Sequence, residues 1–109
     1  MGKIIVSPVT RWPGTVSLHD PLSVPMVAAL ERAIGQARAL ASPTQGEFDA
    51  ALLPGLLPCI EAFSLGGLPA QVGMDNFPGT PRLESAKLIA WLLREVMNLY
   101  TEATADPLA

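Results

Sequence analysis

The sequence predicts a mainly α fold: a three-helix domain preceded by a short β-hairpin or extended arm. Apolar residues recur at helical spacing over three stretches, and residues that favour helix starts precede each of them. The first residues instead show the pattern of short strands. A chain of 109 residues has room for one domain. We divide it into an extended or β-hairpin arm at 1–22, a helical core at 23–102 and a flexible tail at 103–109.

The amino-terminal arm contains two segments of β character. In residues 3–6, Lys3 is followed by three β-branched residues. Residues 15–18 alternate polar with apolar side chains. Trp12-Pro13-Gly14 lies between them and indicates a turn. Two strands alone are marginally stable in water, so we expect the hairpin to pack on the helices or on another subunit.

The first helix is predicted over 24–41. Ser23 is a favourable cap residue, and Pro25 falls in the first turn, where its missing N–H costs little. Residues of one apolar face follow at helical spacing: Val27, Leu30, Ile34, Ala37 and Ala41. Ser42-Pro43 ends the helix.

The second helix is predicted over 45–64. Thr44 and Glu47 have the spacing of a capping box, and a broad apolar stripe begins directly after them. Because Pro54 and Pro58 interrupt this stripe, we expect a kink or two shorter helices. Gly66-Gly67 ends the segment, and a loop rich in glycine and proline follows over 65–80.

The last helix is predicted over 81–102, with Thr80 as its cap and Pro81 in its first turn. It is apolar on two faces. One contains Ala86, Ile89, Leu93, Val96 and Tyr100, and the other contains Leu88, Trp91, Leu92 and Leu99. A three-helix domain easily covers one such face, and we expect this to be the first. The second face, with Trp91, is then expected to contact a second chain. In the alternative, the hairpin covers the second face and the protein is a monomer.

These aromatic and apolar residues are the candidates for protein interaction. They are Trp12, Leu88, Trp91, Leu92, Leu99 and Tyr100. Tryptophan and tyrosine anchor many interfaces, although core packing also accounts for Trp91. The hairpin adds an unpaired strand edge, which invites strand addition from another copy. We therefore predict a homo-oligomer that uses the hairpin and the terminal helix.

No catalytic, metal-binding or cofactor-binding pattern is present in the sequence. The adjacent pair His19-Asp20 would point to opposite faces of a strand, and Cys59 sits within an apolar stripe without a neighbouring histidine. One cysteine excludes a disulfide within the chain, and no phosphate-binding glycine motif occurs. We therefore predict that the protein is not an enzyme, needs no cofactor or metal, and has no small-molecule substrate.

Composition limits the partners. The net charge is −3 and no basic stripe is present, so we expect no binding to nucleic acid. No apolar run is long enough for a signal peptide or a membrane span, so we expect a cytoplasmic protein that does not bind a membrane.

Three stretches together resemble a known family. They are WPGTVSLHDPL at 12–22, LPGLL at 53–57 with GLP at 67–69, and FPGTP at 77–81 leading into LIAWL at 88–92. This order is similar to small proteins encoded among the tail genes of long-tailed bacteriophages and prophages, the tail assembly chaperones. The resemblance implies a helical, oligomeric, non-catalytic protein in the bacterial host cytoplasm. Its client would be the apolar tape-measure protein or another tail protein, and no catalytic residue is implied.

Two further functions remain open alternatives. A structural virion component, such as a tail or head–tail adaptor protein, would share the same gene neighbourhood. A bacterial regulatory or antitoxin-like binding module would instead be encoded beside a toxin gene.

Overall fold

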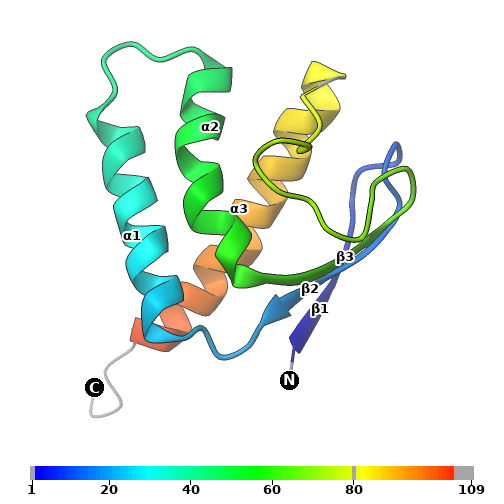
Figure 1. Cartoon of the computed structure of the whole chain (residues 1–109), viewed down its shortest axis with the longest axis horizontal. Helices are drawn as coiled ribbons and strands as arrows, with labels where there is room; N and C mark the ends of the chain where they lie inside the picture. Colours follow the sequence, from blue (N-terminus) through cyan, green and yellow to red (C-terminus); the bar gives the residue numbers. More distant parts are fainter. Residues whose placement is uncertain (1, 80, 105–109) are drawn as a thin grey trace.

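The computed structural model describes residues 2–79 and 81–104 of the chain. The elements in chain order are β1 (Gly2–Val6), β2 (Gly14–His19), α1 (Val24–Ala39), α2 (Gln45–Leu56), a 3₁₀ turn (Leu57–Cys59), β3 (Ile60–Leu65) and α3 (Arg82–Thr104). Figure 1 shows α1 and α2 side by side, α3 crossing behind them, and the three strands on the right-hand side of the view.

The predicted hairpin is confirmed. Strands β1 and β2 pair antiparallel, with Ile4 opposite Ser17 and Ile5 opposite Val16. The turn segment ends at Gly14, the first residue of β2, which has a φ of 132°. A Cβ at this position would lie 2.1 Å from the Ser64 carbonyl oxygen, so only glycine allows this approach of the neighbouring strand.

The expectation of a mainly α fold is wrong, because the structure is a mixed α/β domain. Residues 60–65 form β3, which pairs antiparallel with β2 and completes a sheet of order β1-β2-β3. The sequence pattern predicts a second helix over 45–64, which includes most of these residues. Instead α2 ends at Leu56.

Two prolines explain the early end of α2. Pro54 lies in its last turn and Pro58 in the following 3₁₀ turn, so two backbone N–H donors are missing four residues apart. The chain then becomes extended, and Val16 of β2 pairs with Phe63. The apolar spacing of this segment suits one face of a strand as well as a helix, and its partner strand lies more than forty residues earlier in the sequence.

The remaining helices agree with the prediction to within three residues. The Ser23 side chain caps α1 by accepting a hydrogen bond from the Met26 N–H, and α1 ends at Ala39. Helix α3 spans Arg82–Thr104, so it continues two residues past its expected end into the tail predicted at 103–109. The expected cap, Thr80, and the rest of the tail, residues 105–109, lie outside the described residues.

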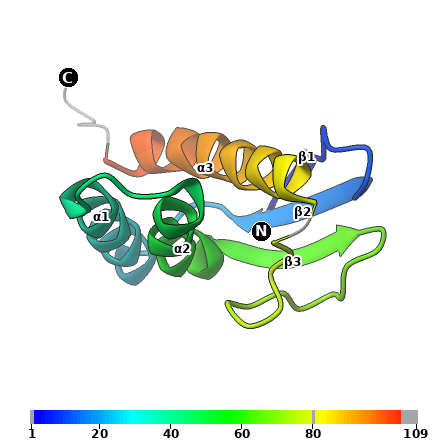
Figure 2. The same ribbon diagram turned by 90° about the horizontal axis from the view of Figure 1, so that it is seen from above.

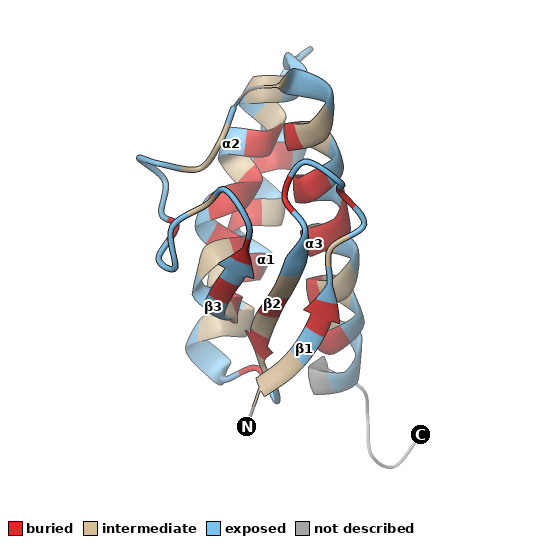
Figure 3. Cartoon of the chain, turned by 90° about the vertical axis from the view of Figure 1, so that its right-hand side faces the viewer, coloured by how far each residue is buried: buried red, intermediate tan, exposed pale blue. Residues whose placement is uncertain are grey.

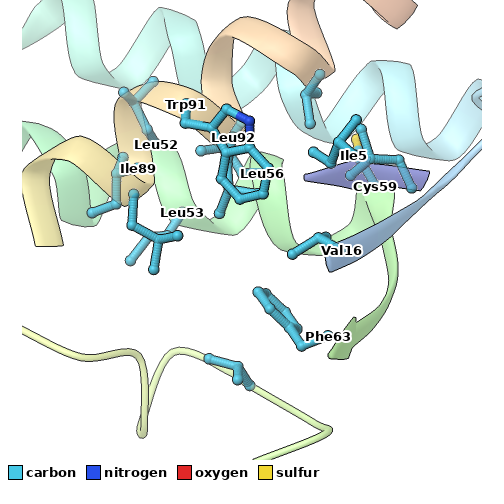
Figure 4. Packing of buried hydrophobic residues seen from close by; sticks show 14 of the residues in the cluster. Ile5, Val16, Leu52, Leu53, Leu56, Cys59, Phe63, Ile89, Trp91 and Leu92 are labelled. Carbon is cyan, nitrogen blue, oxygen red and sulfur yellow. The ribbon is translucent and has the colours of Figure 1, made fainter. Parts of the chain in front are cut away.

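The helices cover one face of the sheet. Figure 2 shows α3 lying over the strands, and Figure 3 shows the opposite face of the sheet open toward the viewer. Along β2, Val16 and Leu18 are completely buried, whereas Thr15, Ser17 and His19 are only partly covered. Figure 4 shows Trp91 and Leu92 of α3 in one cluster with Leu56 of α2, Phe63 of β3 and residues of the other strands.

We expect Thr44→Ala to lower the free energy of unfolding by about 1 kcal/mol. The Thr44 hydroxyl accepts from the Glu47 N–H at 3.2 Å, and a Glu47 carboxylate oxygen accepts from the Thr44 N–H at 3.0 Å. The substitution leaves the Glu47 N–H without its hydrogen-bond partner. Urea denaturation followed by circular dichroism measures the loss. Ser42→Ala, in the same connection but outside the capping box, is the control, and an equal loss in both variants would contradict a capping effect.

Candidate protein-binding groove

The three helices leave an apolar groove between them. Two adjoining hollows of about 180 and 260 Å³ share the side chains of Ile34, Arg38 and Met97. We call them together the interhelical groove and define it by Ile34, Arg38, Phe48, Leu93, Met97 and Tyr100. All six side chains except Arg38 are partly exposed, and Arg38 is exposed.

The packing of the helices explains why this groove stays open. Helix α1 packs closely on α2, and α3 packs on α2 as well, whereas the backbones of α1 and α3 come close at few points. The buried side chains of α3 also lie over the sheet (Figure 2). The Tyr100 hydroxyl bridges the two by donating a 2.8 Å hydrogen bond to Glu31 Oε2. This bond raises the pKa of Tyr100, because donation to the carboxylate requires the protonated hydroxyl. The Tyr100 hydroxyl is therefore protonated at neutral pH, as this donation requires.

Gly35 widens the groove at α1. It lines the larger hollow, and no heavy atom outside its own helical turn lies within 4 Å of the position that a Cβ would occupy. A glycine inside an exposed helix costs about 1 kcal/mol relative to alanine. Packing inside the chain does not require this glycine, so the position is available for close approach of another backbone.

The groove has a polar rim. Arg38 is exposed in the last turn of α1 and borders both hollows, and no ion pair to it is found within the described residues. Glu31 lies one to two turns earlier on the same helix and holds Tyr100. An apolar floor with charged groups at its border suits a partner that is itself amphipathic.

The structure places most of the residues predicted for protein interaction inside the chain's own core. Trp12, Leu88, Trp91, Leu92 and Leu99 are each at most 5% exposed. Tyr100 alone is partly exposed and borders the groove. The second apolar face of α3 is therefore covered within the chain, as in the monomer alternative considered from the sequence.

The face of α3 expected to be covered is instead partly open. Leu93 and Tyr100 belong to it, and Met97, which is part of neither predicted face, lies between them. Sequence reasoning also missed Ile34, Gly35, Arg38 and Phe48 as parts of a site. A glycine within an otherwise regular apolar helix pattern was the one local signal for this groove.

A polar cluster on the open face of the sheet does not have the geometry of a nucleophile and its base. Ser17 Oγ donates a 2.9 Å hydrogen bond to Glu61 Oε1, and His19 Nδ1 lies 4.0 Å from Glu61 Oε2. The serine hydroxyl is thus bound to a solvent-exposed carboxylate that stands between it and the imidazole. An activated serine needs the base itself within hydrogen-bond reach of its hydroxyl.

The Cys59 thiol lies inside the core and not at the surface. The Cys59 side chain is completely buried, and its burial raises the pKa of the thiol to about 11. The reactive thiolate is therefore scarce at neutral pH.

Within residues 2–79 and 81–104, no three histidine, cysteine, aspartate or glutamate side chains gather where they could hold a metal ion. No helix in these ranges combines the length and apolar character needed to cross a membrane.

In comparisons with known proteins, no family model, curated protein or solved structure matches this chain.

Proposed function

We propose that this protein is a non-catalytic, tail assembly chaperone-like protein that holds an amphipathic helix of its client in the interhelical groove. The observation that carries the proposal is the groove itself, where three helices leave partly exposed apolar side chains around an open glycine position. The client implied by the resemblance is the tape-measure protein, and the place of action is the cytoplasm of the bacterial host.

The groove has the features of a helix-binding site. An amphipathic helix binds by laying its apolar stripe into a hydrophobic groove, with anchors every three to four residues. Ile34 and Arg38 of α1 stand one turn apart, as do Leu93 and Met97 of α3. A docked helix would therefore pack between α1 and α3 and cover these partly exposed side chains, while an acidic residue on it pairs with Arg38.

We expect Gly35→Leu to weaken client binding by about tenfold or more, which corresponds to about 1.4 kcal/mol. Leucine favours a helix over glycine, and the space beside Gly35 is open, so the fold is retained and stability rises by about 0.5–1 kcal/mol. The same side chain fills the groove. A variant that is more stable but binds less cannot be explained by misfolding.

The measurement is co-expression with the tape-measure protein of the genome that carries this chain. The soluble fraction of the tape-measure protein is measured, together with the amount that co-purifies with a tagged copy of the chain. Both quantities are compared for wild type and Gly35→Leu. Gln36→Leu, on an exposed position of α1 that does not line the groove, is the matched control. Equal co-purification of the client with both variants would contradict the groove, and a stoichiometric presence of the chain in purified particles would favour a virion component.

A further inference from the structure

The sheet has one open edge. The Ser7 N–H donates to the Gly14 carbonyl at 2.9 Å, which fixes the alternation of the ladder between β1 and β2. Backbone groups of alternate residues point to the same side, so those of Ile5 and Lys3 point toward β2, as those of Ser7 do. The backbone N–H and C=O groups of Gly2, Ile4 and Val6 therefore point away from the sheet. Within the described residues, no backbone hydrogen bond to these outward groups is found.

The opposite edge is covered. On β3 the Phe63 N–H donates to the Ala70 carbonyl at 3.4 Å, and the Leu65 carbonyl accepts from the Leu68 N–H at 3.2 Å. The loop after β3 thus takes the place of a fourth strand there. Figure 3 shows β1 at the border of the sheet, with β2 and β3 on its other side.

The open edge is also apolar. Ile4 is 68% exposed and Val6 is 73% exposed, and both side chains lie on the face of the sheet that the helices leave open. The one charge of β1, on Lys3, belongs to the opposite face. Edge strands of monomeric proteins are usually protected by charges or by covering segments. The open face of β1 therefore carries no charge and two exposed β-branched side chains, which favours pairing with another strand.

We infer that a second copy of this chain pairs its β1 with this edge, antiparallel and around a two-fold axis at Ile4. The two Ile4 residues then face each other, and each Gly2 faces the Val6 of the other copy, so all outward backbone groups of both strands are used. Four β-branched side chains form one apolar strip across the dimer. Lys3 lies opposite Ile5 of the other copy, so no like charges are directly opposed.

The chain itself limits this pairing to one register and one added copy. Pro8 occupies the next outward position after Val6 and has no N–H to donate, so the ladder ends at Val6. A shift by two residues would leave outward groups unpaired at both ends. Because each copy has a single open edge, the pairing closes as a dimer with a continuous six-stranded sheet.

Cysteine cross-linking tests the register. In the dimer the two Ile4 Cα atoms are about 5.5 Å apart, which lies inside the range of a disulfide. We expect Ile4→Cys to form a covalent dimer, twice the 11.5 kDa chain, on oxidation with oxidised glutathione at about 100 µM protein. Non-reducing electrophoresis follows the product. The wild-type chain, in which Cys59 is completely buried, measures the background of cross-linking.

Val6→Cys is the matched control. Val6 is at least as exposed as Ile4, but in the proposed register the two Val6 residues are four positions apart along the strands, about 14 Å. Its cross-linking is expected to be at least tenfold slower. Equal rates for both variants would overturn the register, because random collisions do not distinguish the two positions.

Sedimentation of the unmodified chain tests the dimer without a disulfide. Ile4→Lys places like charges opposite each other at the two-fold axis and is expected to give a monomer. Ala62→Lys, on the same open face but on the covered strand β3, is expected to leave the dimer intact. A single 11.5 kDa species of the wild-type chain at about 100 µM, the concentration of the cross-linking experiment, would overturn the inference.

Discussion

Replacing Trp91 with alanine is expected to lower the free energy of unfolding by about 3–5 kcal/mol. The side chain is 5% exposed and belongs to the buried cluster between α3, α2 and the sheet. Truncation removes a large apolar area from the core, and the rigid elements around it close the resulting cavity only in part. Figure 4 shows Trp91 with Leu56, which is completely buried.

Urea denaturation followed by circular dichroism measures this loss. Tyr100→Ala is the control, because Tyr100 is the aromatic residue of the same helix that lies at the groove border and is partly exposed. Its expected loss is about 1–2 kcal/mol, from one hydrogen bond and part of a ring. If Trp91→Ala instead leaves the unfolding midpoint unchanged and only dissociates an oligomer, Trp91 is an interface residue.

The helix starts could be predicted from the sequence because capping is local. Ser23 caps α1 through Met26, and Thr44 with Glu47 caps α2, in each case within three residues of the chain. The hairpin is local as well, since its strands are neighbours in sequence. These elements depend on side-chain chemistry and on turn residues that stand beside one another.

The third strand and the site could not be predicted in this way. Whether Ile60 and Phe63 line a helix or a strand is decided by β2, and Val16 lies 47 positions before its partner Phe63. Leu88 and Leu92 of α3 are completely buried, whereas the groove opens on the other face of this helix. The face of the terminal helix that the sequence predicts to be covered is therefore partly open, and the face predicted to be open is covered.

Substituting Gly55 with alanine is expected to destabilise the protein by about 1–3 kcal/mol, although alanine is the better helix former. Gly55 lies where α2 crosses α1. A Cβ there would lie 2.6 Å from the Ala33 Cβ, 2.9 Å from the Leu30 Cα and 3.0 Å from the Ala29 carbonyl oxygen. Two of these three atoms are backbone, so the contact is relieved only if α1 moves away from α2.

Gly35→Ala separates this packing effect from helix propensity. It makes the same chemical change in α1, where nothing lies within 4 Å of the new methyl group, and is expected to stabilise the protein by about 0.5–1 kcal/mol. Opposite signs in urea denaturation would therefore support a close contact at Gly55, and a gain in both variants would contradict it. Because α1 carries Ile34 and Arg38, its displacement by Gly55→Ala should also reshape the interhelical groove and reduce client binding. Gly55→Ala is thus expected to change the proposed binding site through the packing of α1 on α2.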